Sequence, residues 1–406
     1  MSNLKKLGPG LLYAGAAIGV SHIVQSTRAG AEYGYVLIIA IVLAHIFKYP
    51  FFAVGPRYAN LSGENLIQGY TKLHKSVLWL LFLLTVSTMF TIQAAVTVVT
   101  AGLAQKLTGI DLPTAVWSGI LLAICYAILQ IGRFGALDKL MKVIMILLAI
   151  STVLAVAFSF RMDGIDLAIK PNFSLRNPVH IAFLIAFIGW MPAPLDISIW
   201  HSIWTRRKYE EEGERKLATE NFDFKTGFYG TAFLAICFLV LGANTLFSSG
   251  IELEASAGKF AGQLVDIYTS SLGSWSYYII VIAAFTTMFS TTLTCFDALP
   301  RVMQAIVGES KTPQVNALNK KGLWMIVLAI GVLIILGFYV ENMKQMVTIA
   351  TVVSFLTAPI LAGLSILLVR KSKYASSIWN RRETQLAFVG FLFLLLFSVY
   401  YLSILL

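Results

Sequence analysis

The sequence is poor in charge, in cysteine and in enzyme motifs. Only 13% of its 406 residues are charged, whereas 58% are hydrophobic, and a soluble core of this length does not need so much apolar surface. Its three cysteines, Cys125, Cys237 and Cys295, lie far apart in apolar stretches. There are no CxxC pairs and no His/Cys spacings of the kind that bind zinc. We therefore assign the thiols to packing.

Motifs for nucleotide binding and hydrolysis are missing as well. The chain has no GxxxxGK[ST] phosphate-binding loop, so ATP-driven transport is not encoded, and it has no HExxH or GxSxG signature. A membrane-embedded enzyme that uses His22 and Asp196 is one alternative, but no nucleophile can be placed beside them. We expect no enzymatic activity and no cofactor.

Long hydrophobic runs fill most of the chain instead. Eleven of them are long enough for a membrane-spanning helix, which takes roughly 20 residues. The runs lie near 8–30, 34–56, 77–105, 113–131, 140–160, 179–205, 227–248, 274–300, 323–340, 344–369 and 384–405. We predict an all-α integral membrane protein that forms a single transmembrane domain, residues 1–406.

The net charge of +11 is distributed unevenly. If the N-terminus is cytoplasmic, the inner connections hold 23 of the 31 Lys and Arg residues, and the outer connections hold six. This positive-inside pattern predicts a multi-pass protein of the plasma (inner) membrane, with its N-terminus inside and its C-terminus outside. The basic balance is thus a topology signal, and we expect no nucleic-acid partner.

Two of the predicted spans are interrupted, the first at Gly19–His22 (GVSH) and the sixth at Met191–Asp196 (MPAPLD). Unpaired backbone at membrane depth is tolerated only inside protein or beside a watery cavity. Paired interruptions in corresponding halves of a chain indicate a transporter's binding site. We therefore expect a LeuT-type fold with two inverted five-helix repeats, 8–160 and 179–369, followed by one extra helix at 384–405.

The interruptions carry most of the candidate substrate-binding residues. These are Gly19, Ser21, His22 and Gln25 in the first span, and Met191, Ala193 and Asp196 in the sixth. A deep ionisable side chain is a functional candidate by default, although polar groups also hold membrane helices together. Asp196 could bind substrate or a coupling ion, pair with His22, or act as the N-cap of the following half-helix.

Other polar residues could line a pathway or bind a coupling ion. This second set comprises Arg28, Thr91, Gln93, Thr287, Thr291, Asp297 and His201. Arg28 could instead pair with Glu32 or snorkel to the outer interface, and His201 could serve helix packing or a cytoplasmic vestibule. The third span has no charged residue, whereas a membrane proton relay usually needs Asp, Glu or His.

Short motifs around the first interruption resemble a known family. Gly8-Pro9-Gly10, Ala29-Gly30 and Tyr33-Gly34-Tyr35 have the spacing of the first span of NRAMP (natural resistance-associated macrophage protein) metal transporters. His201-Ser202, just after the second interruption, and the count of eleven spans are also similar to the family. The resemblance covers the whole chain as topology, but as motifs it covers only the first and sixth spans.

The resemblance implies that the metal site of the family has changed here. The family's DPGN motif aligns with Gly19–His22, so a glycine stands at the metal-binding Asp. Met191-Pro192 resembles the start of the family's MPH motif, but Ala193 replaces its His. An alternative alignment, anchored on His201-Ser202, puts Asp196 at the position of that His. The acidic proton path of the third span is absent, because Thr91–Thr100 carries no acid.

These differences leave the sign of the cargo open. Loss of a fixed carboxylate favours an anion such as bicarbonate, which half-helix N-termini and the polar groups near Ser21 would bind. A divalent metal such as Mg²⁺ or Mn²⁺ is the alternative, with Asp196 and His22 as its ligands. We predict a monomeric secondary-active transporter of a small inorganic ion, coupled to Na⁺ or H⁺, with an ion channel as a more distant alternative.

Overall fold

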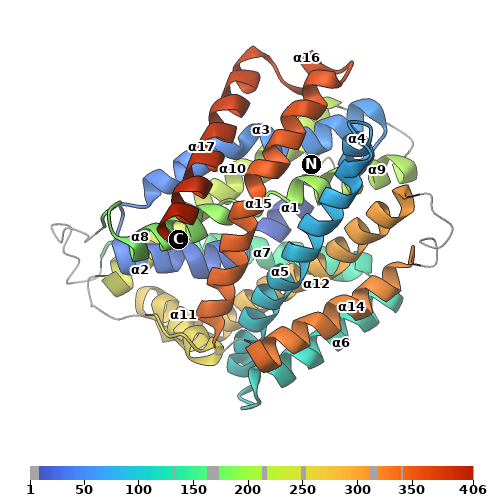
Figure 1. Ribbon diagram of the computed structural model, residues 1–406. Helices are drawn as coiled ribbons and strands as arrows, with labels where there is room; N and C mark the ends of the chain where they lie inside the picture. The colour runs from blue at the N-terminus through green and yellow to red at the C-terminus, as the bar shows by residue number, and fades with distance from the viewer. Residues whose placement is uncertain are drawn as a thin grey trace.

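A computed structural model describes residues 9–131, 134–161, 173–212, 217–247, 253–310, 318–339 and 342–405. Every regular element in these ranges is a helix (Figure 1). Eight of the described helices are long and apolar enough to cross a membrane, and shorter apolar helices accompany them. The predicted all-helical membrane fold is confirmed, while the count of eleven spans stays a prediction.

The first half of the chain begins with a helix in three pieces. The helices of this half are α1 (Pro9–Ala17), the π-helix η2 (Ser21–Ser26), α2 (Thr27–Tyr33), α3 (Ile38–Ser62), α4 (Leu66–Thr71), α5 (Ser76–Thr108), α6 (Thr114–Ile131) and α7 (Phe134–Ser159). Helix α4 connects the second and third predicted spans. It begins with a capping box, in which Asn65 and Gln68 satisfy each other's backbone N–H groups.

The second half repeats this order of elements, beginning with the second interrupted helix. Its helices are α8 (Pro178–Gly189), α9 (Ile197–Glu212), α10 (Leu217–Gly242), η3 (Ala243–Phe247), α11 (Ala257–Leu272), η4 (Ser274–Ser276), α12 (Tyr277–Glu309), α14 (Lys321–Ile334), η5 (Ile335–Tyr339), α15 (Met343–Lys371), α16 (Ala375–Ile378) and α17 (Arg381–Leu405). Each predicted span therefore contains a helix at nearly the expected position.

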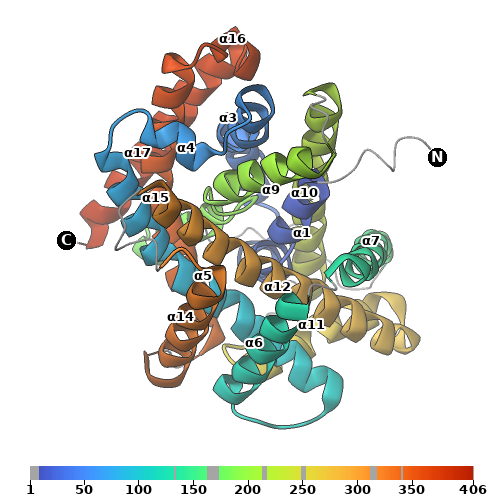
Figure 2. The ribbon, with the colours of Figure 1, turned by 90° about the vertical axis from the view of Figure 1, so that its right-hand side faces the viewer.

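The interrupted helices are enclosed by long continuous ones. In Figure 2, α12 crosses the middle of the molecule and contacts α5 on one side and α1 on the other. Helix α9 packs on α3, and α8 packs on α15. Glycines permit the closest approaches: a Cβ on Gly55 would lie 2.2 Å from the carbonyl oxygen of Ser198, and one on Gly189 would lie 2.3 Å from that of Thr351. Small residues have this role in membrane helix packing generally.

Candidate functional site

The first interruption is short. Helix α1 ends at Ala17, the chain bends at Ile18 and Gly19, and helical structure resumes at Val20. The N–H groups of His22 and Ile23 both donate to the carbonyl of Gly19, at 3.1 and 2.9 Å. The predicted discontinuity is thus confirmed. However, these two N–H groups are not the free anion donors that the sequence led us to expect.

His22 is held by both of its ring nitrogens. Its Nε2 lies 2.9 Å from the carbonyl oxygen of Thr231 on α10, and its Nδ1 lies 2.7 Å from the hydroxyl of Ser21. Since a carbonyl can only accept, Nε2 carries the hydrogen, and Nδ1 of the neutral ring can only accept from the Ser21 hydroxyl. That hydroxyl has a single hydrogen and also lies 2.6 Å from the carbonyl oxygen of Ala17, so the two acceptors compete for it. The side chain is fully buried. His22 therefore joins α10 to Ser21, and the predicted pairing of His22 with Asp196 is absent.

The second interruption is longer and irregular. Helix α8 ends at Gly189, α9 begins at Ile197, and residues 190–196 between them are not helical. The Met191–Pro192 peptide bond is cis. Met191 and Ala193 are fully buried in this stretch. The discontinuity lies where the sequence predicts it.

A buried lysine meets the start of the second interruption. Lys48 of α3 is 0% exposed, and its Nζ donates to the carbonyl oxygens of Ile188 and Gly189 at 2.6 and 3.0 Å. These are the last carbonyls of α8, at the negative end of its dipole, and the carbonyl of Ile188 also accepts from the N–H of Met191 at 3.1 Å. No ion pair joins Lys48 to an acid among the described residues. In the sequence, Lys48 is a single lysine within the predicted span 34–56, and no motif there assigns it a role.

Asp196 lies at the opposite end of the same stretch. It is 5% exposed, and Thr88 of α5 donates to its Oδ1 at 3.2 Å. Its Oδ2 has no hydrogen-bond partner in the part of the chain that the structure describes. Asp196 occupies the N-cap position of α9, yet its carboxylate faces Thr88 on a neighbouring helix. The second interruption therefore has a cation at its start and a carboxylate at its end.

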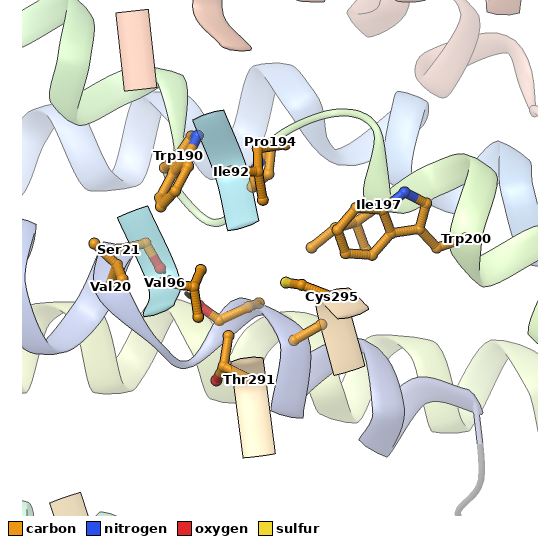
Figure 3. Close-up of a pocket in the computed structure, with 12 residues that line it drawn as sticks. Val20, Ser21, Ile92, Val96, Trp190, Pro194, Ile197, Trp200, Thr291 and Cys295 are labelled. Carbon is orange, nitrogen blue, oxygen red and sulfur yellow. Dashed lines mark hydrogen bonds between the residues drawn. The ribbon is translucent and has the colours of Figure 1, made fainter. Parts of the chain in front are cut away.

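A small cavity of about 20 Å³ lies between the two interruptions and the long helices α5 and α12 (Figure 3). A cavity of this size holds about one water-sized molecule. Its lining comprises Ala16, Ala17, Val20, Ser21, Ile92, Val96, Trp190, Pro194, Ile197, Trp200, Thr291 and Cys295. Of the predicted site residues, only Ser21 and Thr291 belong to it. Gly19 packs beside it, since a Cβ there would lie 2.8 Å from Thr291.

Two candidates that follow the first interruption, Gln25 and Arg28, bond to nearby side chains. Gln25 is buried and its Nε2 lies 3.5 Å from the hydroxyl of Thr351. Arg28 donates to Glu32 at 2.6 Å and also stacks over the ring of Phe183. The Arg28–Glu32 pairing that the sequence offered as an alternative is the one observed.

The candidates on α5 and α12 differ in their hydrogen bonds, and among Gln93, Thr91 and Thr287 only Gln93 joins the two helices. Gln93 donates to Thr97 on its own helix and to the carbonyl of Thr292 on α12. The hydroxyl of Thr91 bonds to its own helix, while the buried hydroxyl of Thr287 has no partner among the described residues.

The last two candidates, Asp297 and His201, do not line the cavity. Asp297 bonds to Arg301 and Lys321. The ring of His201 is buried and stacks on Tyr13, as a packing residue would. Within the described ranges, no group of three or more His, Cys, Asp or Glu residues could hold a metal ion.

Comparison with known proteins places this geometry in a class. Residues 10–404 match the family model described as natural resistance-associated macrophage protein-like. An uncharacterized protein of Pasteurella multocida (strain Pm70) is 34% identical over 414 residues, which cover 99% of this chain and 93% of the relative.

Solved structures share the fold at low identity. A manganese transporter of Eremococcus coleocola, in complex with an aromatic bis-isothiourea substituted compound, aligns with a TM-score of 0.73 at 14% identity, over 99% of this chain and 86% of that one. MhsT in complex with L-phenylalanine aligns with a TM-score of 0.62 at 15% identity, over 96% and 98% of the two chains.

The protein is therefore a multi-pass membrane transporter with a LeuT-type fold. Within that class, the chain belongs to the natural resistance-associated macrophage protein-like family.

Proposed function

We propose that this protein is a secondary-active, alternating-access transporter of a small inorganic anion, with bicarbonate as the first candidate. The cavity between the two interrupted helices is the proposed cargo site, and the hydroxyls of Ser21 and Thr291 are its polar contacts. At about 20 Å³ it takes one water-sized molecule, so the movement that opens the site must widen it for an anion of four heavy atoms. We further propose that the protein is a monomer in the plasma (inner) membrane. Its N-terminus is proposed to be cytoplasmic, because the connections on the same side as the N-terminus hold most of the Lys and Arg residues.

The observation that carries the anion proposal is Lys48. In transporters with discontinuous helices, the carbonyl ends of half-helices coordinate the transported or coupling cations. Here the last carbonyls of α8 already bind the ammonium group of Lys48. That charge repels a second cation at the same place and attracts an anion. The dipole at the N-terminus of α9, which begins at Ile197 in the cavity wall, has the same sign.

A divalent metal is the second candidate, and one finding favours it. The aligned transporters from Eremococcus coleocola are manganese transporters. Asp196 would be the first ligand of such an ion, because its Oδ2 is buried and has no partner among the described residues. His22 would have to release Thr231 or Ser21 before it could join.

Flux measurements in proteoliposomes separate the two cargoes. We expect saturable uptake of radiolabelled bicarbonate by the wild type and a loss of roughly tenfold or more in Lys48→Met, since an interaction with a charged group contributes about 1.5–3 kcal/mol. Lys48→Arg keeps the charge and should retain part of the flux. Lys75→Met, at an exposed lysine of the α4–α5 link, is the matched control.

The opposite pattern would overturn the proposal. Saturable Mn²⁺ uptake without bicarbonate uptake, with Asp196→Asn as the damaging change, would establish the metal reading. Monodisperse elution in detergent must accompany each variant, so that a folding defect is not taken for a transport defect.

A further inference from the structure

The carboxylate of Asp196 has few hydrogen-bond donors. Among the described residues, the hydroxyl of Thr88 is the side-chain donor to its Oδ1. The hydroxyl oxygen of Thr88 lies 3.2 Å from Asp196 Oδ1, 3.1 Å from the carbonyl oxygen of Leu84 and 3.4 Å from that of Thr85. The two carbonyls belong to the interior of α5 and accept backbone N–H groups there, so they need no further donor. The hydroxyl has one hydrogen, which goes either to its own helix or to Asp196, so the bond to the carboxylate is not assured.

The second carboxylate oxygen of Asp196 also lacks a side-chain donor among the described residues. Asp196 Oδ2 is buried without a partner in the described ranges, and the nearby backbone N–H of Asp196 itself is the other interaction of this carboxylate. Among those residues no Lys, Arg or His forms an ion pair with Asp196. Burial of an uncompensated carboxylate is costly, so it favours either protonation of Asp196 or a bound cation.

We propose that Asp196 and Thr88 bind Na⁺ as the coupling ion of the transporter. Carboxylate and hydroxyl oxygens are ligands that hard cations prefer. A cation could be held by both carboxylate oxygens and the Thr88 hydroxyl together, whereas a proton would be carried by one carboxylate oxygen alone. This inference rests on the proposed transport function for the word "coupling", but the binding of Na⁺ itself does not depend on it.

The position of the site explains how Na⁺ would affect the cargo. Asp196 lies two residues after Pro194 and directly before Ile197, and both of these line the cargo cavity. Thr88 lies one helical turn from Ile92, which also lines it. An ion held between Thr88 and Asp196 would fix the end of the second interruption against α5. Binding of Na⁺ would thus order one wall of the cavity before the cargo enters.

Titration of the purified protein with Na⁺ tests the inference directly. Intrinsic fluorescence is a suitable readout, since Trp200 lies on the first turn of α9 and in the cavity wall. At constant ionic strength, balanced with choline, we expect a saturable Na⁺ response that K⁺ does not reproduce. Asp196→Asn and Thr88→Val should each weaken the apparent affinity at least tenfold. Ser87→Ala, whose hydroxyl bonds to its own helix, is the matched control.

The outcomes separate this inference from the proposed function. Specific Na⁺ binding that both site variants lose supports the site, even if bicarbonate flux is absent. Bicarbonate uptake that depends on Na⁺ in the wild type and not in Thr88→Val would extend this to coupling. A wild type without a Na⁺ response would overturn the site, even with normal bicarbonate uptake. If a pH gradient alone drove the flux, and Asp196→Asn abolished it, the coupling ion at Asp196 would be a proton and the Na⁺ proposal would be wrong.

Discussion

The two interrupted helices differ in how their polar groups are satisfied. In the first, His22 is bonded at both ring nitrogens, the Ser21 hydroxyl is shared between His22 and the carbonyl of Ala17, and the hydroxyl of Ser26 donates to the carbonyl of Ser21. One turn further on, the buried Oε1 of Gln25 has no partner among the described residues. In the second, seven residues leave the helix, a lysine from α3 binds the preceding carbonyls, and the carboxylate of Asp196 keeps one oxygen without a partner among the described residues.

This difference separates a structural role from a transport role. The two bonds of His22 stabilise one arrangement of the chain, so changes at His22 should act mainly on stability, whereas Ser21 beside it also lines the cavity. In the second interruption, a buried lysine on the last carbonyls of α8 and an incompletely satisfied carboxylate are groups that a bound ion can rearrange. Changes in the second interruption should therefore act mainly on transport, and the same substitution at both places tests this contrast.

The largest effect is expected for Gly189→Ala, at the end of α8. A Cβ there would lie 2.3 Å from the carbonyl oxygen of Thr351 on α15, and backbone cannot move aside as a side chain can. We expect the free energy of unfolding to fall by roughly 1–3 kcal/mol, with transport lost as well. Thermal unfolding in detergent and proteoliposome flux measure the two effects. Gly230→Ala, where a Cβ meets nothing within 4 Å, is the control; equal effects in both variants would contradict this account.

An intermediate effect is expected for His22→Leu. The substitution removes the bonds to Thr231 and Ser21 while roughly keeping the volume, and each lost hydrogen bond costs about 1 kcal/mol. The melting temperature should fall, while the apparent affinity for bicarbonate should change only a few-fold, through the freed Ser21 hydroxyl. Lys48→Met should show the reverse balance. If His22→Leu abolished flux without lowering the melting temperature, the first interruption would be a direct ligand site.

The smallest effect is expected for Gly19→Ala. The added Cβ would lie 2.8 Å from a methyl carbon and 2.9 Å from the hydroxyl of Thr291, which are side-chain atoms that can move. Adjustment of one side chain costs about 0.5–1.5 kcal/mol. We expect a small drop in the melting temperature and a modest drop in uptake, since Thr291 lines the cavity. A loss as large as that of Gly189→Ala would mean that both interruptions are equally rigid.

Much of the fold could be predicted from the sequence, because apolar length and broken periodicity are local properties. The runs near 34–56 and 344–369 became α3 and α15, and the stretch with Pro192 and Pro194 left the helix as proline requires. The candidate site was harder to predict. Of the seven proposed substrate residues, Ser21 alone lines the cavity, together with Thr291 from the proposed pathway set.

Lys48, which the sequence did not single out, shows why the candidate site was harder to predict than the fold. In the sequence it is one lysine in a long apolar run, and snorkelling to an interface would explain such a residue. Its role depends on the end of α8, 140 positions away in the chain. The partner of Asp196, Thr88, is separated from it by 108 positions.

The sequence by itself thus determined the class of protein, the helical segments and the two places where helices are interrupted. These follow from hydrophobic length, proline and glycine, which act on the backbone within a few residues. Only the tertiary structure decided which polar groups satisfy one another and which remain for an ion. Whether Asp196, His22 or Lys48 has a partner depends on α5, α10 and α8, which packing brings together across the whole chain.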